Sequence, residues 1–226
     1  MILLARSAPF RLAALSPVEQ LRAGRLLRRV PQLLFGLSLY GFSMAMMVRA
    51  GLGLNPWDVL HQGLARHLPL SFGGVTVVVG VVVLLLWIPL RQLPGLGTVA
   101  NVLVIGVTVD LGLAVLAPPD HLVTRIGLLL GGVVLNGLAG AVYIGSQLGP
   151  GPRDGLMTGL AARTGASLRL IRTGIELSVL ATGFLLGGTV GLGTVLYAVS
   201  IGPLVQLFLP WVAVRLPVPT EEPTCT

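Results

Sequence analysis

The strongest constraint on this chain is an internal repeat that contains no gap. Residues 33–110 align with residues 129–206 at a constant offset of 96, and 26 of the 78 aligned pairs are identical. Self-similarity over this length indicates a duplicated structural unit rather than a chance match of apolar residues. The sequence therefore predicts two halves built on one plan.

The identities gather in two motifs that occur once in each half. The first motif runs from Leu52 to Ala65 and recurs from Leu148 to Ala161. The second runs from Gly95 to Val99 and recurs from Gly191 to Val195. Both motifs lie between or at the ends of long apolar stretches, where functional and turn-forming residues are expected.

Composition identifies the solvent of this protein as a lipid bilayer. Apolar residues make up 54% of the chain, charged residues 10%, and the mean hydropathy is +0.91, which lies outside the range of soluble domains. Six segments are long enough to cross about 30 Å of hydrocarbon: 30–48, 71–90, 98–116, 122–144, 171–188 and 194–212. The predicted fold is an all-α polytopic membrane protein with six transmembrane helices.

Each repeat contains three spans, and this odd number makes the second copy enter the bilayer from the opposite side. We therefore expect two inverted three-helix repeats, an architecture common among secondary transporters. The predicted organisation is an Arg-rich cytoplasmic segment over 1–29, repeat one over 30–118, repeat two over 119–213 and a cytoplasmic polar tail over 214–226.

The arginines predict the orientation. With the N-terminus in the cytoplasm, only Arg49, Arg66 and Arg125 fall outside, and the other twelve of the fifteen cations fall inside, as the positive-inside rule requires. Both termini are then cytoplasmic, in a bacterial inner membrane. The net charge of +7 reflects this topology and not a nucleic-acid partner, because the basic residues flank membrane spans and form no reader motif.

The N-terminal region predicts a signal anchor and a short surface helix. The first apolar stretch aligns with the fourth, so it belongs to the fold and is not a cleaved signal peptide. Ahead of it, Ser16, Pro17 and Glu19 have the pattern of a capping box. The single cysteine, Cys225, excludes an intrachain disulfide, and the three dispersed histidines predict no metal site.

The first motif predicts a short helix after a glycine-rich break in each half. Pro56 and Pro152 suit the first helical position, with Asn55 or Gly151 as the cap. An aspartate then falls at the third helical position of each, where a carboxylate complements the helix dipole. These aspartates are Asp58 and Asp154.

Two interpretations of these short helices stay open. In one they lie on the membrane surface, the aspartates are caps, and Gly53 and Gly149 merely permit the turn. In the other they are re-entrant, and their free amides, carboxylates and unwound carbonyls border a cavity, since irregular backbone at membrane depth requires protein or cavity water around it.

The second motif and the charges within the spans complete the candidates. Thr98 and Thr194 are expected as helix N-caps rather than ligands. Glu176 and Asp110 are ionisable residues inside spans and are functional candidates for that reason; Arg172 precedes Glu176 by one turn, so a structural ion pair is an equal alternative. The hypothetical substrate-binding set is Asp58, Asp154, Asn55, Pro56, Pro152, Gly53, Gly149, Glu176 and Asp110.

At these motifs the chain resembles the YczE branch of the YczE/YyaS/YitT family of bacterial integral membrane proteins. The residues that carry the resemblance are Gly53–Asp58, Gly149–Asp154, Glu176 and Gly187–Thr194. The resemblance extends over about residues 30 to 210, and it implies an integral membrane protein without a settled biochemical activity.

The sequence favours a gradient-driven small-molecule transporter or exporter with a site between the two inverted repeats. The alternative is a non-transporting membrane scaffold or regulator that partners a biosynthetic enzyme. No nucleophile, base and orienting group can be assembled, so we do not expect an enzyme, and no cofactor or metal is predicted. The expected partners are the lipid bilayer, an unknown small molecule and a second copy of the chain.

Overall fold

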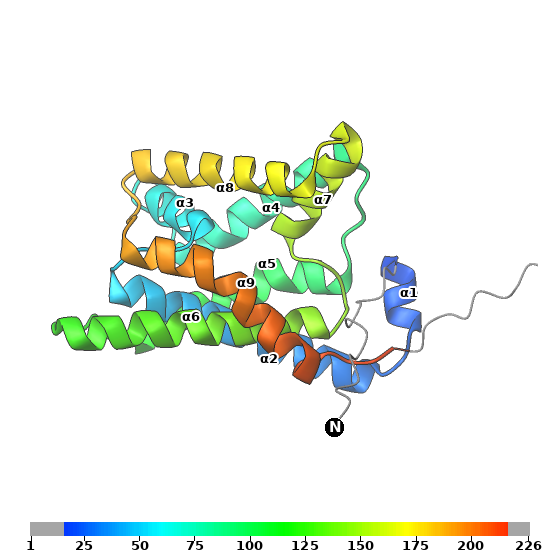
Figure 1. Ribbon diagram of the computed structural model, residues 1–226, viewed down its shortest axis with the longest axis horizontal. Helices are drawn as coiled ribbons and strands as arrows, with labels where there is room; N and C mark the ends of the chain where they lie inside the picture. Colours follow the sequence, from blue (N-terminus) through cyan, green and yellow to red (C-terminus); the bar gives the residue numbers. More distant parts are fainter. Residues whose placement is uncertain (1–15, 217–226) are drawn as a thin grey trace, which may run out of the picture.

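The computed structural model describes residues 16–216, and within that range it contains only helices and loops. The helices are α1 (Pro17–Arg22), α2 (Leu26–Ala50), α3 (Pro56–Ala65), α4 (Phe72–Leu90), α5 (Leu96–Val115), α6 (Leu122–Gly145), α7 (Pro152–Thr164), α8 (Leu168–Leu185) and α9 (Leu192–Val212). The long helices lie along the long axis of the molecule, whereas the short helices α3 and α7 lie toward its opposite ends (Figure 1). The all-helical prediction is confirmed.

The duplication is exact in the positions at which the helices begin. Helices α6, α7, α8 and α9 each begin 96 residues after α2, α3, α4 and α5, respectively. Four helices therefore recur in the same order. Two helices or residues that are related by this offset of 96 are equivalent. The first of the predicted segments, residues 1–29, and the predicted tail lie partly outside the described residues.

Five of the predicted spans are helices long and apolar enough to cross a membrane: α2, α4, α5, α6 and α9. The remaining span, predicted over residues 171–188, is the 18-residue helix α8. It is less apolar because Arg169, Arg172 and Glu176 lie in its first half.

A buried arginine joins the start of α2 to the end of α6. The Arg29 side chain is fully buried and donates hydrogen bonds to the carbonyl oxygens of Ser146 (2.8 Å) and Gln147 (2.6 Å). A cation at a helix C-terminus satisfies free carbonyls and complements the dipole. Arg29 also donates to the carbonyl of Gln20 in α1, so it fixes the N-terminal helix to the bundle.

The equivalent arginine makes the equivalent contact in the other direction. Arg125, at the start of α6, donates to the carbonyls of Ala50 (2.7 Å) and Gly51 (3.0 Å) at the end of α2. Each helix thus has its first turn beside the last turn of the other. The two equivalent helices therefore run antiparallel, and they form the central packing of the bundle.

The glycine-rich break of each half is held by the second motif of the other half. The amide of Gly97 donates to the carbonyl of Leu148 (2.7 Å), and the amide of the equivalent Gly193 donates to the carbonyl of Leu52 (2.8 Å). These four residues form two equivalent pairs. The unwound segments are thus buried in protein, which is the condition for irregular backbone at membrane depth.

The prediction that Thr98 and Thr194 are N-caps is wrong by three positions. Helices α5 and α9 begin earlier, with Gly95 and Gly191 as caps, and each threonine is the third helical residue. Its hydroxyl instead accepts a hydrogen bond from the cap amide, at 3.2 Å in both halves. Glycine has no side chain that could cap the helix. The hydrogen bond from the glycine amide to the threonine hydroxyl is the half of a capping box that the third helical residue supplies.

The short helices pack across the two halves. Helix α3 packs on α8, and its equivalent α7 packs on α4. A Cβ atom on Gly155 of α7 would lie 2.0 Å from the Trp87 ring, and a Cβ on Gly183 of α8 would lie 2.4 Å from the amide nitrogen of Leu60. Glycine is therefore required on α7 at one interface and on α8 at the other.

The predicted capping box at the N-terminus is confirmed. The Ser16 amide donates to the Glu19 carboxylate (2.8 Å), and the Glu19 amide donates to the Ser16 hydroxyl (3.4 Å). The hydrogen bonds from Ser16 lower the pKa of Glu19 below its usual value, because they stabilise the ionised carboxylate. Helix α1 thus begins at Pro17 as its sequence indicates.

Candidate functional site

A central cavity lies where the N-termini of the two short helices meet. Its volume is about 330 Å³, and both first-turn prolines, Pro56 of α3 and Pro152 of α7, lie on its wall. The other lining residues are Tyr40, Asn55, Trp57, Asn101, Ile105, Asn136, Gly140, Tyr143, Ile144, Gly151, Arg153, Asp154, Met157, Arg172, Glu176, Tyr197, Ile201, Gly202, Val205 and Gln206. The predicted first-turn prolines and their caps, Asn55 and Gly151, are confirmed.

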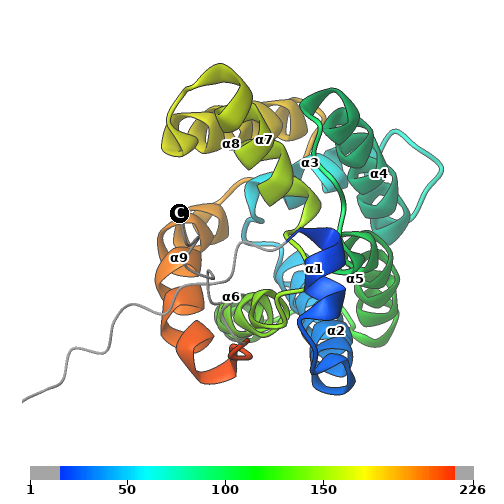
Figure 2. The ribbon, with the colours of Figure 1, turned by 90° about the vertical axis from the view of Figure 1, so that its right-hand side faces the viewer.

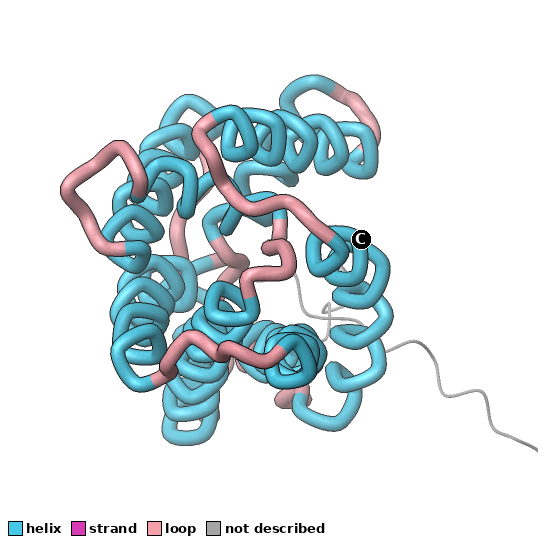
Figure 3. Tube along the Cα trace, turned by 90° about the vertical axis from the view of Figure 1, so that its left-hand side faces the viewer, coloured by secondary structure: helices cyan, strands magenta, loops and turns pink. Residues whose placement is uncertain are grey.

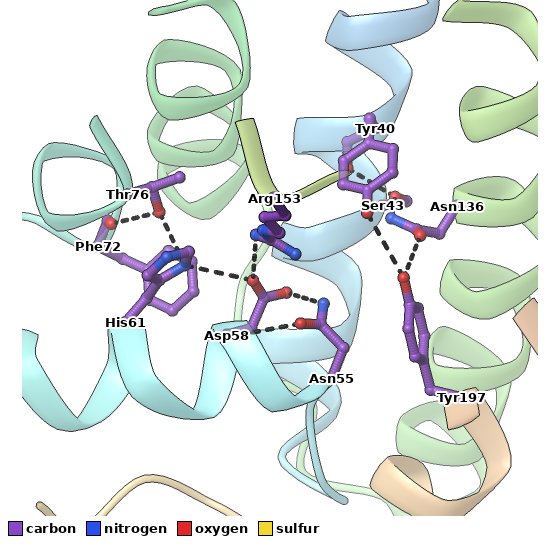
Figure 4. A network of polar contacts seen from close by, with 10 residues as sticks. All are labelled: Tyr40, Ser43, Asn55, Asp58, His61, Phe72, Thr76, Asn136, Arg153 and Tyr197. Atoms are coloured by element: carbon purple, nitrogen blue, oxygen red, sulfur yellow. Dashed lines mark hydrogen bonds and ion pairs between the residues drawn. The ribbon is translucent and has the colours of Figure 1, made fainter. Parts of the chain in front are cut away.

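Asp58 lies directly behind the cavity wall and is completely buried. Asn55 caps the helix by accepting a hydrogen bond from the Asp58 amide (3.0 Å), and its side-chain amide donates to Asp58 Oδ2 (2.5 Å). The other carboxylate oxygen lies 3.4 Å from Nδ1 of His61 and 3.8 Å from Nη2 of Arg153 (Figure 4). Buried charges are held in place by such partners, so Asp58 positions Arg153 rather than facing the cavity itself.

Arg153 also stacks on an aromatic ring of the other half. Its guanidinium carbon lies 5.0 Å from the centre of the Trp57 ring, within the range of a cation–π interaction. The Trp57 side chain is only 6% exposed, and its indole nitrogen has no hydrogen-bond partner among the described residues. A buried N–H donor on the wall of a cavity is available to a ligand or to water.

Polar side chains from the long helices form the opposite wall. The Tyr197 hydroxyl donates to Asn136 Oδ1 (2.9 Å), and the Asn136 side-chain amide donates to the Ser43 hydroxyl (2.8 Å). The Tyr40 and Tyr197 hydroxyls lie 3.5 Å apart (Figure 4). Tyr40 and Asn136 hold equivalent positions in the two halves, as do Asn101 and Tyr197. Two positions of the repeat thus supply four polar residues to the cavity, because each position carries a tyrosine in one half and an asparagine in the other.

Three further charged residues line the cavity. Arg172 Nε donates to Glu176 Oε1 at 2.9 Å, so the predicted ion pair forms, and both members also border the cavity. The cavity thus accounts for two of the three charged residues of α8. Asp154, the equivalent of Asp58, faces the cavity and has no arginine or histidine nitrogen within 4 Å among residues 16–216.

The remaining predicted site residues lie outside the cavity lining. Gly53 and Gly149 have φ angles of +117° and +125°, which only glycine adopts freely, and each packs against the second motif of the other half. Asp110 accepts hydrogen bonds from the Gly73 amide (2.7 Å) and the Ser71 hydroxyl at the start of α4. It acts there as a cap supplied by a neighbouring helix.

Several residues that the fold brings to the cavity are not among the predicted site residues. Arg153, Trp57 and Tyr143 are the clearest. A signal for the first two was present, because they occupy the same position in the two copies of the first motif and differ from one another. Divergent residues inside an otherwise repeated motif mark the place where the two halves meet and must complement each other.

Comparisons with known proteins agree with the predicted resemblance. Residues 27–210 match a family of unknown function, DUF6198. An uncharacterized protein of Haemophilus influenzae is 44% identical over 84% of this chain and 87% of its own length. From Bacillus subtilis, the uncharacterized membrane protein YczE is 32% identical over 77% of this chain and 82% of its own, and the uncharacterized protein YyaS is 26% identical over 77% and 89%. No solved structure matches the chain.

Proposed function

The chain belongs to DUF6198, a family of unknown function, and we propose that it is a gradient-driven transporter or exporter of a small molecule. The observation that carries this proposal is the cavity of about 330 Å³ between the N-termini of α3 and α7. Paired short helices that approach a central site from opposite ends are characteristic of secondary transporters. The volume suits a small molecule rather than a single ion.

The proposal includes an inverted orientation of the two halves in a bacterial inner membrane. It is supported by the antiparallel course of α2 and α6 and by the swapped arginine contacts at their ends. With the N-terminus in the cytoplasm, α3 enters from the outside and α7 from the inside. Alternating access then follows from rocking one half against the other around the site.

Flux measurements on a cavity variant test the transport function. Purified protein is screened against small molecules for thermal stabilisation, since a ligand that binds only the folded state raises the melting temperature. Molecules that stabilise it are then assayed for uptake into proteoliposomes under proton or sodium gradients. We expect Asp154→Asn to abolish flux while the protein still inserts. Asp120→Asn, which changes an exposed loop carboxylate, is the matched control and should retain it.

A scaffold function predicts the opposite pattern. Flux would be absent in the wild type for every stabilising molecule, and activity of a partner enzyme would depend on the N-terminal segment or the polar tail. That result would replace transport with the scaffold as the function of this chain.

Cysteine labelling tests the re-entrant geometry. In a Cys225→Ser background, Trp57→Cys and Arg153→Cys place one thiol at the start of each short helix. Protection of both thiols from a membrane-impermeant reagent applied to either side supports re-entrant helices. Labelling of either thiol by reagent added on one side of the membrane contradicts re-entrant helices. Arg66→Cys and Arg163→Cys, at the exposed C-terminal ends of α3 and α7, are the accessible controls.

A further inference from the structure

The two halves differ most where α8 meets α9. Helix α4 packs closely on α5, but their equivalents α8 and α9 stand apart and share no comparable interface (Figures 2 and 3). A Cβ atom on Gly106 of α5 would lie 2.4 Å from the Val77 side chain of α4. A Cβ on the equivalent Gly202 of α9 would meet nothing within 4 Å. The same glycine is thus a packing site in one half and faces open space in the other.

The residues of α8 explain why this seam is open. In α4, Gly73 and Val77 contact α5 around Gly106, and Gly80 contacts it at Val102. The equivalent positions of α8 carry larger or polar side chains, namely Arg169, Thr173 and Glu176. Close helix pairing in a bilayer depends on small residues at the contact, and charged residues within membrane segments face a polar cavity. The sequence of α8 therefore opposes the tight pairing that α4 and α5 form.

The cavity reaches this seam from inside. Arg172 and Glu176 of α8 and Gly202 and Gln206 of α9 all belong to its lining. Gly202 is exposed, and a Cβ atom there would meet nothing within 4 Å. The cavity lining is therefore not closed by packing at this position of α9.

One carboxylate of the cavity, that of Asp154, forms no ion pair with the described residues. Arg153 is paired with Asp58, and Arg172 with Glu176. Asp154 faces the same space without a cationic partner within 4 Å among the described residues. Four aromatic side chains, Tyr40, Trp57, Tyr143 and Tyr197, also line the cavity. A carboxylate that has no ion pair within 4 Å and lies beside aromatic rings is the chemistry that recognises an organic ammonium group.

We infer that the α8–α9 seam is a lateral entrance from the bilayer to the cavity, and that its substrate is an amphiphilic organic cation whose charged group binds at Asp154. This inference rests on the proposed transport function and names its substrate class. The apolar part of such a molecule would lie along Ile201 and Val205 of α9, which line the cavity next to Gly202. A molecule of this kind partitions into lipid and reaches a lateral opening directly.

Binding of hexyltrimethylammonium to the purified protein in lipid nanodiscs tests the substrate class. The wild type should bind radiolabelled probe saturably, and Asp154→Asn should weaken binding about tenfold or more, since it leaves the charge unpaired. Asp120→Asn, which changes an exposed loop carboxylate outside the cavity lining, should retain binding. Equal binding by Asp154→Asn, or competition by hexanol as strong as by the unlabelled cation, would overturn the assignment.

A bulky residue at the seam and a matched control outside it test the entrance. Gly202→Trp places an indole where a Cβ atom meets nothing within 4 Å, and it should slow probe binding about tenfold or more. Val199→Trp puts the same bulk on an exposed face of α9 outside the cavity lining, and it should bind at the wild-type rate. Equal rates in Gly202→Trp and Val199→Trp would exclude entry through the seam.

These outcomes separate the inference from the transport function. If the probe binds at Asp154 but is not transported in proteoliposomes, the binding site is supported and the transport function is contradicted. If a neutral or anionic molecule is transported along a gradient and the cation does not bind, the transport function is supported and the proposed substrate class is contradicted.

Discussion

Trp57 and Arg153 occupy the same position in the two halves of the chain, and in the folded protein they stack on each other, with the guanidinium carbon 5.0 Å from the ring centre. The contact forms because α3 and α7 bring their first turns to one cavity from opposite ends. Two identical residues at this position could not make it, since two arginines repel and two tryptophans leave Asp58 without a cation. Divergence after duplication has thus produced a complementary pair at the centre of the protein.

Arg153 and Asp58 should be energetically coupled. Arg153→Gln leaves a buried carboxylate without its cation and is expected to lower the free energy of unfolding by about 3 kcal/mol. Asp58→Asn should cost a similar amount, and the double variant clearly less than the sum. Thermal unfolding of all four proteins in detergent measures the cycle. Additive losses would show that the 3.8 Å contact contributes nothing.

Arg29 and Arg125, each of which donates to the last turn of the other's helix, should both contribute to stability. Arg125→Ala releases the carbonyls of Ala50 and Gly51, and Arg29→Ala releases those of Ser146 and Gln147. Each change should lower the unfolding free energy by about 2 kcal/mol or more, because hydrogen bonds to charged groups are among the stronger ones.

Chemical unfolding of the reconstituted protein measures the effect of these arginines. Arg169→Ala is the control, because Arg169 makes no hydrogen bond to the described residues and should unfold within about 0.5 kcal/mol of the wild type. A loss for Arg29→Ala or Arg125→Ala no larger than for this control would contradict the capping role.

Gly155 should not tolerate any side chain. Gly155→Ala places a methyl group 2.0 Å from the Trp87 ring and should destabilise the protein by about 1 to 3 kcal/mol through overpacking. Gly174→Ala adds a methyl group that meets nothing within 4 Å, so it should be neutral or stabilising in a helix. Melting temperatures compare the two variants. Combining Gly155→Ala with Trp87→Leu should recover part of the loss, and no recovery would place the strain elsewhere.

The hydrogen bonds of the Tyr197 and Tyr40 hydroxyls should contribute unequally to the stability of the protein. Tyr197→Phe removes the donor to Asn136 at 2.9 Å and is expected to cost about 1 kcal/mol. Tyr40→Phe removes only a contact of 3.5 Å and should cost less. Melting temperatures of both single variants, measured side by side, decide the order. A larger loss for Tyr40→Phe would reverse the assignment of the stronger hydrogen bond.

The helices themselves were largely predictable. Proline at the first turn, an Asn or Gly cap and a long apolar stretch are local signals, and they located α3, α7 and the spans within a few residues. The main differences have physical causes. Thr98 and Thr194 are the third helical residues and not the caps, because glycine serves as the cap. Helix α8 is less apolar in part because Arg172 and Glu176 line a cavity.

The site was predictable only in part. Asn55, Pro56, Pro152, Asp154 and Glu176 lie on the cavity wall. Motif spacing identified the first four, and Glu176 was selected as a charge inside a predicted span. Asp58 lies one layer behind it and Asp110 caps α4, because a carboxylate at a helix start serves equally well as a cap, an ion-pair partner or a ligand. Local spacing cannot separate these three roles.

Membrane character, the repeat and the helix starts follow from properties that each segment carries alone, such as hydropathy and cap chemistry, so the chain specifies them without reference to its fold. The pairings of Trp57 with Arg153 and of α2 with α6, like the gap between α8 and α9, join residues far apart in the chain. They depend on how the antiparallel halves cross, and only the assembled structure brings those atoms together. The offset of 96 relates equivalent positions, but the packing decides which of them meet.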